Sequence, residues 1–301
     1  LSANVSRPVH ISIWHPARKT ETKERLKVKD YLQVLKKEEE WPNLPFSYFF
    51  DWFYIGNTEV NKKNSDYQVQ ASLGSDFLDS DNPIIIYSAS YQASSAENFI
   101  LAEYYASYGY TFIAIPSKGA KSSSLQGGSI SDAYAQSRDV DFVIQHLAEL
   151  GVMGERRIYL SGFSFGGISH MINGLKSNEI AGIISFDGTI KYKPELLEMS
   201  FEWDAGKFRI PFIHFSQTDI PVPILKREGI DTLINDKFEF YDQTNACIKY
   251  QLKSKVLTHK YFSSFGLLFN ELDEDQDKSY EHASVAYSDL MKTSLFFLQE
   301  L

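Results

Sequence analysis

Residues 157–167 read RIYLSGFSFGG, and this stretch decides the fold that we expect. Arg157–Leu160 carries the apolar run of a strand that is buried on both faces of a sheet. Three glycines follow within Ser161–Gly167, which is typical of a tight turn, and a helical pattern then extends to about Leu175. The stretch therefore predicts a strand, a sharp turn and a helix, with Ser164 in the turn.

The segments around this stretch alternate between strand and helix patterns. The other expected strands are Val9–Trp14, Ile84–Tyr87, Thr111–Ile115, Ala181–Phe186, Phe212–Phe215 and Ile248–Leu252, and the other expected helices are Ala96–Tyr108, Ala133–Leu150 and Tyr287–Leu301. Strands that alternate with helices form βαβ units, which build a mostly parallel sheet with helices on both faces. We therefore expect a single α/β domain over residues 1–301.

Residues 17–80 do not follow this alternation and are expected to form an insertion or cap-like segment. Thr22–Glu40 is charged, with spaced apolar residues, and predicts an exposed helix. The aromatic-rich segment 46–54 has two interpretations, a helix packed on the core or a cap over an apolar pocket.

The overall composition excludes some partners. The formal net charge of -9 repels phosphate backbones, so no nucleic acid partner is expected, whereas small neutral or lipid-like substrates fit. No apolar run approaches the roughly 18 residues of a transmembrane helix. The chain begins at Leu1 rather than Met and has no charged-then-apolar leader, so either a signal segment was removed on export or the sequence was trimmed. We favour an exported, periplasmic or secreted protein over a cytoplasmic one. The sequence does not predict an oligomeric state.

Gly162-Phe163-Ser164-Phe165-Gly166 fits the pattern G-x-S-x-G between a strand and a helix. A side chain at either glycine of such a turn would collide with the neighbouring backbone, so the serine is held, strained, above the edge of the sheet. Its hydroxyl then lies at a helix N-terminus, where backbone N–H groups favour a developing negative charge. The pattern predicts that Ser164 is a nucleophile.

A serine nucleophile needs a general base and a carboxylate that orients the base. In a parallel sheet these partners are expected just after later strands, because the strand C-termini share one edge. His259 lies a few residues beyond the last expected strand, and His282, before the terminal helix, is the alternative base. Asp187 and Asp219 each follow a later strand, so both qualify as the acid.

From Pro83 to about Gly266 the chain resembles the platelet-activating-factor acetylhydrolase and dienelactone hydrolase group of α/β-hydrolases. The resemblance does not extend to the insertion at 17–80. It rests on GFSFGG at Gly162–Gly167, on Phe186-Asp187-Gly188, and on THKYFSSFG at Thr258–Gly266. It implies the α/β-hydrolase fold, with a mostly parallel central sheet and helices on both faces.

The resemblance also implies roles for the candidate residues. In acetylhydrolases of this type the acid follows the strand after the nucleophile helix, which matches Asp187. Their histidine lies in a His-x-x-Phe segment, which matches His259 followed by Phe262. Dienelactone hydrolases place the acid one strand later, which would select Asp219.

The activity implied is that of a serine esterase or acylhydrolase that cleaves a carboxylic ester through an acyl-enzyme on Ser164. The implied substrate is small or lipid-like. The alternatives are an acyltransferase and a non-catalytic binding protein on a hydrolase scaffold.

The chain departs from this group after the strand that supplies half of the oxyanion hole. The group usually carries His-Gly there, whereas this chain has Ala89-Ser90. A backbone N–H needs no particular side chain, so Tyr91 and Phe165 are the matched oxyanion donors. The loss of glycine is expected to alter the path of the loop.

No metal and no cofactor are expected. Asp273, Asp275 and Asp277 superficially suggest a calcium loop, but the sixth position lacks glycine and the twelfth is Ser284. The glycine pairs do not form the phosphate-binding pattern G-x-G-x-x-G. A solvated acidic turn is the better interpretation of residues 271–277.

Overall fold

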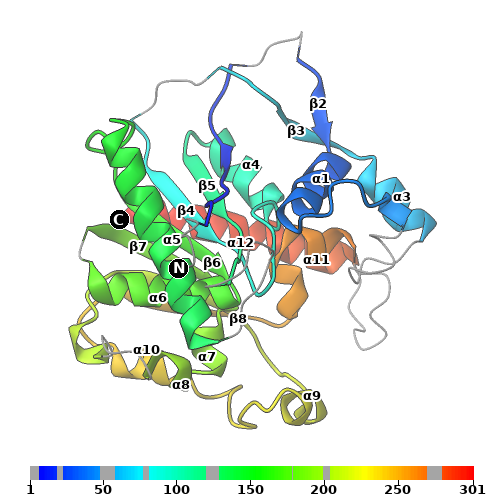
Figure 1. The fold of residues 1–301 in the computed structure, drawn as a ribbon. Coiled ribbons are helices and arrows are strands. Elements are labelled where there is room, and N and C mark those ends of the chain that lie inside the picture. The colour runs from blue at the N-terminus through cyan, green and yellow to red at the C-terminus, as the bar shows by residue number, and fades with distance from the viewer. Residues whose placement is uncertain are drawn as a thin grey trace, which may run out of the picture.

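The computed structural model describes residues 7–18, 23–47, 58–76, 81–119, 129–177, 179–198, 204–269 and 280–301. At its centre is a seven-stranded sheet in the order β1-β5-β4-β6-β7-β8-β9 (Figure 1). The strands are β1 (Ser12–Trp14), β4 (Ile84–Ser88), β5 (Thr111–Ile115), β6 (Ile158–Phe163), β7 (Ile180–Phe186), β8 (Phe212–Gln217) and β9 (Lys249–Ser254). β1 runs antiparallel to β5, and the other neighbours are parallel, as expected.

Helices cover both faces of this sheet, which confirms the expected layers. Ile85 and Tyr87 of β4 pack in the same apolar layer as α4 (Phe99–Ser107) and α12 (Tyr280–Glu300). Ile84 and Ile86 pack on the opposite face with α5 (Ile130–Glu149) and α6 (Phe165–Lys176) (Figure 1). Each fully buried side chain of this size contributes about 1.5–3 kcal/mol, so the central strands anchor the fold.

Of the exposed helix predicted over Thr22–Glu40, the helix is present over a shorter range, but the prediction that it is exposed is wrong. Residues Arg25–Lys27 form a strand, β2, which pairs antiparallel with β3 (Gln68–Ser72) outside the central sheet. The helix α1 is limited to Val28–Glu38, and its apolar residues, among them Leu32, are buried in the core. The spacing of these apolar residues is that of a helix with one buried face. The many charged residues between them made the segment look like an exposed helix.

The rest of the insertion is only partly described. A short helix, α3 (Glu59–Ser65), begins at Thr58, whose side chain accepts a hydrogen bond from the Asn61 N–H. Phe46 packs on the core cluster, and the Lys36 Nζ lies 4.5 Å from its ring centre. Residues 48–57 lie outside the described ranges, so both interpretations of the aromatic segment 46–54 stay open.

Several short elements connect the strands and helices on the C-terminal side of the turn after β6. They are α7 (Thr189–Tyr192), α8 (Glu195–Glu198), η1 (Ala205–Lys207), α9 (Val222–Arg227), α10 (Glu239–Gln243), η2 (His259–Phe262) and α11 (Ser264–Leu268). One to two turns are too short for a 3.6-residue pattern to stand out, so the sequence did not predict them. Of the helices described, none is long and apolar enough to cross a membrane.

The strand order reverses at β4, which has β5 on one side and β6 on the other. At such a switch point the segments that leave neighbouring strands diverge and form a crevice at the carboxyl ends of the strands. The segment after β4 and the turn after β6 both leave at this point. The fold therefore brings the loop after Ser88 close to Ser164.

Candidate active site

Ser164 occupies the sharp turn between β6 and α6. Its φ angle is +52°, a left-handed conformation that costs a non-glycine residue roughly 1–2 kcal/mol. The Ser164 N–H donates to the Phe186 carbonyl at 2.9 Å, and its carbonyl accepts from the Thr189 N–H at 2.9 Å. Backbone hydrogen bonds to the neighbouring strand and to α7 thus hold the strained residue in place.

The two glycines of the pattern are required by close backbone contacts. A Cβ atom on Gly162 would lie 2.5 Å from the Gly166 carbonyl carbon. A Cβ on Gly166 would overlap the Ser88 carbonyl oxygen at the end of β4. The turn after β6 therefore packs directly against the segment that leaves β4.

His259 begins the short helix η2 beyond β9. The Ser164 Oγ lies 3.0 Å from its Nε2, and Asp187 Oδ2 lies 2.6 Å from its Nδ1. The ring packs on Phe163, with 4.9 Å between ring centres, and the side chain is 46% exposed. The carboxylate at Nδ1 favours the tautomer in which Nε2 carries no proton and accepts from the serine hydroxyl.

Asp187 follows β7 directly and is fully buried. Beyond His259, its carboxylate accepts hydrogen bonds from the Gln217 N–H at 3.0 Å, from the Gln217 Nε2 at 3.1 Å, and from the Tyr192 hydroxyl. Burial alone would raise the pKa of Asp187, but the hydrogen bond to His259 and the other donors outweigh burial and lower it. Asp187 is therefore held as a carboxylate inside the protein.

The structure brings together Ser164, His259 and Asp187, but not the alternative residues. Asp219 is exposed, and its carboxylate accepts a hydrogen bond from the Thr218 hydroxyl at 3.4 Å. His282 is exposed near the start of α12, and both ring nitrogens of His259 already have the partners described above.

Two residues of this site, Tyr192 and Gln217, were missed from the sequence. Tyr192 lies in α7, which is too short to predict. Gln217 is the last residue of β8, two residues before Asp219. A polar residue at the end of the strand after Asp187 was the sequence signal that could have identified it.

The loop after β4 contains the amide groups of the expected oxyanion hole. The Ala89 N–H donates to the Ile115 carbonyl at 3.1 Å, and the Ser90 N–H donates to Glu97 Oε2 at 2.9 Å. Within the described ranges, the N–H groups of Tyr91 and Phe165 donate to no acceptor. Both amides, which the sequence singled out, are therefore available to a ligand.

Glu97 lies beneath this loop with only 6% of its surface exposed. Its carboxylate accepts hydrogen bonds from the Ser90 N–H, from the Ser90 hydroxyl and, at 2.9 Å, from the Tyr87 hydroxyl. Burial raises the pKa of Glu97 to about 7, although these donors and the nearby His259 lower it. The sequence did not single out this residue.

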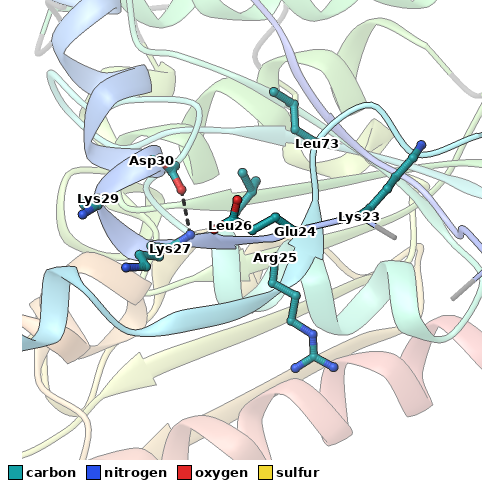
Figure 2. A pocket seen from close by; sticks show the side chains of 8 residues that line it. All are labelled: Lys23, Glu24, Arg25, Leu26, Lys27, Lys29, Asp30 and Leu73. Atoms are coloured by element: carbon teal, nitrogen blue, oxygen red, sulfur yellow. Dashed lines mark hydrogen bonds between the residues drawn. The ribbon is translucent and has the colours of Figure 1, made fainter. Parts of the chain in front are cut away.

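A separate hollow of about 570 Å³ lies beside β2 and the start of α1 (Figure 2). Its lining includes the basic side chains Lys23, Arg25, Lys27 and Lys29. Lys27 and Lys29 lie 3.7 Å and 2.8 Å from a carboxylate oxygen of Asp66, which offsets part of the positive charge. None of Ser164, Asp187 and His259 lines this hollow.

No cluster of His, Cys, Asp or Glu within the described ranges could hold a metal ion. The acidic stretch with Asp273, Asp275 and Asp277 lies outside those ranges.

No protein-family model and no curated protein matches the chain. Among solved structures it is similar to a ferulic acid esterase from Streptomyces cinnamoneus, with a TM-score of 0.63 and 15% identity over 95% of this chain and 81% of the other. A thermophilic esterase from Thermogutta terrifontis matches with a TM-score of 0.45 and 17% identity over 73% of this chain and 83% of the other. The chain has the α/β-hydrolase fold. At these identities the similarity shows the fold alone, and any inference about the reaction has to come from the residues of the site.

The buried carboxylate of Glu97 predicts a specific pH dependence of stability. Between pH about 4.5 and about 7 the unfolded chain has released this proton while the folded protein retains it, so the contribution of Glu97 to the free energy of unfolding falls as pH rises. Relative to Glu97→Gln, the free energy of unfolding of the wild type should fall by on the order of 3 kcal/mol across this window. Above pH about 7 the difference between the two proteins should change little. Urea denaturation at several pH values measures the difference. A difference that is constant or rises with pH would contradict the prediction.

Proposed function

We propose that the chain is a serine esterase that cleaves a carboxylic ester of a small or lipid-like substrate. The observation that carries this proposal is the unbroken relay of Ser164 Oγ, His259 and Asp187, with separations of 3.0 Å and 2.6 Å. These three groups have the order and the spacing that acyl transfer through a serine needs.

In the proposed reaction the Ser164 Oγ attacks the carbonyl carbon of the ester while its proton moves to His259 Nε2. The electron pair of the carbonyl π bond moves to the carbonyl oxygen. When the tetrahedral adduct collapses, His259 returns the proton to the leaving alcohol and an acyl-enzyme remains. Water then attacks the acyl group by the same route, and Ser164 is restored.

The negative charge that forms on the carbonyl oxygen needs hydrogen-bond donors. The Phe165 N–H lies at the N-terminus of α6, where the helix dipole also favours negative charge. We assign the Tyr91 N–H as the second donor, because the two preceding amides of its loop already have acceptors.

The position of the acid favours the acetylhydrolase type over the dienelactone hydrolase type, because Asp187 follows the strand directly after the nucleophile helix. Acyl transfer to an alcohol uses the same steps, with the alcohol in place of water. A binding protein without turnover is the alternative from another class. Reaction with a fluorophosphonate distinguishes it, because only an activated serine reacts, and a panel of p-nitrophenyl esters of increasing acyl length defines the substrate.

Ser164→Ala should abolish ester hydrolysis, with a loss of kcat on the order of a millionfold, because no other group can form the acyl-enzyme. The fold should be retained, since the substitution removes only a hydroxyl group. Hydrolysis of the preferred p-nitrophenyl ester and circular dichroism measure the two effects. Retention of more than a few per cent of the activity would exclude Ser164 as the nucleophile.

His259→Ala should remove activity, because the serine then has no base, whereas His282→Ala should change kcat less than twofold. The matched pair tests the choice between two exposed histidines. Steady-state rates for both variants decide it, and the opposite result would assign the base to His282.

Asp187→Asn should lower kcat by about four orders of magnitude, because an amide at this position no longer selects the required tautomer of His259. Asp219→Asn should lower kcat by tenfold or less, since its side chain is exposed and away from the ring nitrogens. Comparing kcat of the two variants on one ester tests the assignment. A large loss in Asp219→Asn with a small loss in Asp187→Asn would overturn it.

A further inference from the structure

The turn after β4 takes a strained path without glycine. Its residues are Ser90 to Ala93, closed by a hydrogen bond from the Ala93 N–H to the Ser90 carbonyl at 3.3 Å. Gln92 has a φ angle of +52°, which costs a residue with a side chain roughly 1–2 kcal/mol. Something must hold this turn, because the Tyr91 N–H within it can act as an oxyanion donor only from a fixed position.

The carboxylate of Glu97 provides that hold. One oxygen accepts from the Ser90 N–H at 2.9 Å, and the other accepts from the Ser90 hydroxyl. Ser90 is therefore held by hydrogen bonds from both its backbone N–H and its side-chain hydroxyl. The next amide along the chain is that of Tyr91.

These contacts act on the turn and not on the base of the loop. Ala89, one residue earlier, is held independently, by the Ile115 carbonyl on its N–H and by Gln136 Nε2, which donates to its carbonyl at 2.8 Å. Removal of the Glu97 carboxylate would leave these bonds intact. Burying a carboxylate is also costly, and an apolar side chain would satisfy a purely structural position at less cost.

The neighbouring residue extends the same support to the other side of the site. Asn98 Nδ2 donates to the Phe262 carbonyl at 3.0 Å, and Asn98 Oδ1 accepts from the Ser264 N–H at 3.0 Å. Phe262 ends the short helix that His259 begins. Glu97 and Asn98, which directly precede α4, thus contact both the turn that contains Tyr91 and the segment that contains His259.

We propose that Glu97 is a positioning residue of the oxyanion hole, which grips Ser90 so that the Tyr91 N–H faces the oxyanion formed on the Ser164 adduct. This inference rests on the proposed esterase function.

The test compares Glu97→Leu with Glu97→Gln. Leucine removes both acceptors, so kcat should fall by about 10²–10³, as on loss of one oxyanion donor, while KM changes less than threefold. Glutamine retains an oxygen for the Ser90 N–H, and its NH₂ group can donate to the Ser90 oxygen. Glu97→Gln should therefore retain kcat within about tenfold of the wild type.

Glu103 in α4, the helix that follows Glu97, supplies the matched control. Its carboxylate accepts from the Tyr31 hydroxyl at 2.7 Å and from the Gln70 N–H at 2.9 Å, on elements of the insertion. Glu103→Leu removes a similar set of hydrogen bonds away from the site. It should lower the melting temperature and leave kcat within twofold of the wild type.

A transition-state analogue separates positioning from general damage. A trifluoromethyl ketone with the preferred acyl chain forms an adduct on Ser164 whose oxyanion occupies the hole. Its inhibition constant should rise in Glu97→Leu by the same factor by which kcat/KM falls. If Glu97→Leu does not fold, Ser90→Ala, which removes the hydroxyl contact, replaces it and should show a parallel change of about tenfold.

The outcomes distinguish the two proposals. A wild type that hydrolyses no ester and is not labelled at Ser164 by a fluorophosphonate overturns the proposed function and this inference with it. If the wild type is active, this inference alone is overturned when the folded Glu97→Leu variant retains the wild-type kcat and the wild-type affinity for the ketone. Ser90→Ala decides in the same way where it replaces Glu97→Leu. The same holds if Glu103→Leu loses as much kcat as Glu97→Leu.

Discussion

The contact between the backbone of Ser88 and the helix start at Gly166 is the constraint on which the site depends. It allows no side chain at Gly166, so α6 must begin directly beneath the end of β4. Gly166 also approaches the Ala89 carbonyl, so the turn that carries Ser164 packs on the first residues of the loop that contains Tyr91. Ser164 itself has a positive φ angle, and its Oγ lies 3.0 Å from His259 Nε2. The close packing of backbone on backbone therefore fixes this turn against the loop that carries one of the proposed oxyanion donors.

Two buried carboxylates near the site differ in pKa because their hydrogen-bond donors differ. Asp187 is fully buried but has four hydrogen-bond donors, so it is held as an anion next to a histidine that is nearly half exposed. Glu97 is also buried and accepts hydrogen bonds from Ser90 and from the Tyr87 hydroxyl, but burial outweighs these donors and raises its pKa to about 7. The two carboxylates lie near the same histidine, yet their surroundings move their pKa values in opposite directions.

The sequence predicted the parts of the molecule that repeat a pattern. β5 has the predicted bounds, and β4 and β7 differ by one residue, because a strand buried on both faces is a continuous apolar run. Ser164, Asp187 and His259 could be chosen because polar residues directly after parallel strands meet at one edge. Tyr192, Gln217 and Glu97 could not, since their contacts depend on short helices and on one particular turn. The charged helix at α1 was misjudged as exposed because its charges outnumber its buried apolar residues.

Backbone strain is concentrated where the chemistry is proposed. Ser164, Asp187 and Gln92 all have positive φ angles, and each costs roughly 1–2 kcal/mol. Strain of this kind persists only where the surroundings determine the conformation several times over. Here each strained residue is tied to a neighbouring element: Ser164 to β7, Asp187 to β8, and the turn of Gln92 to Glu97 through Ser90. Two apolar layers with central strands buried on both faces supply the stability that offsets these costs. The two apolar layers of the sheet therefore contribute to holding these strained conformations in place.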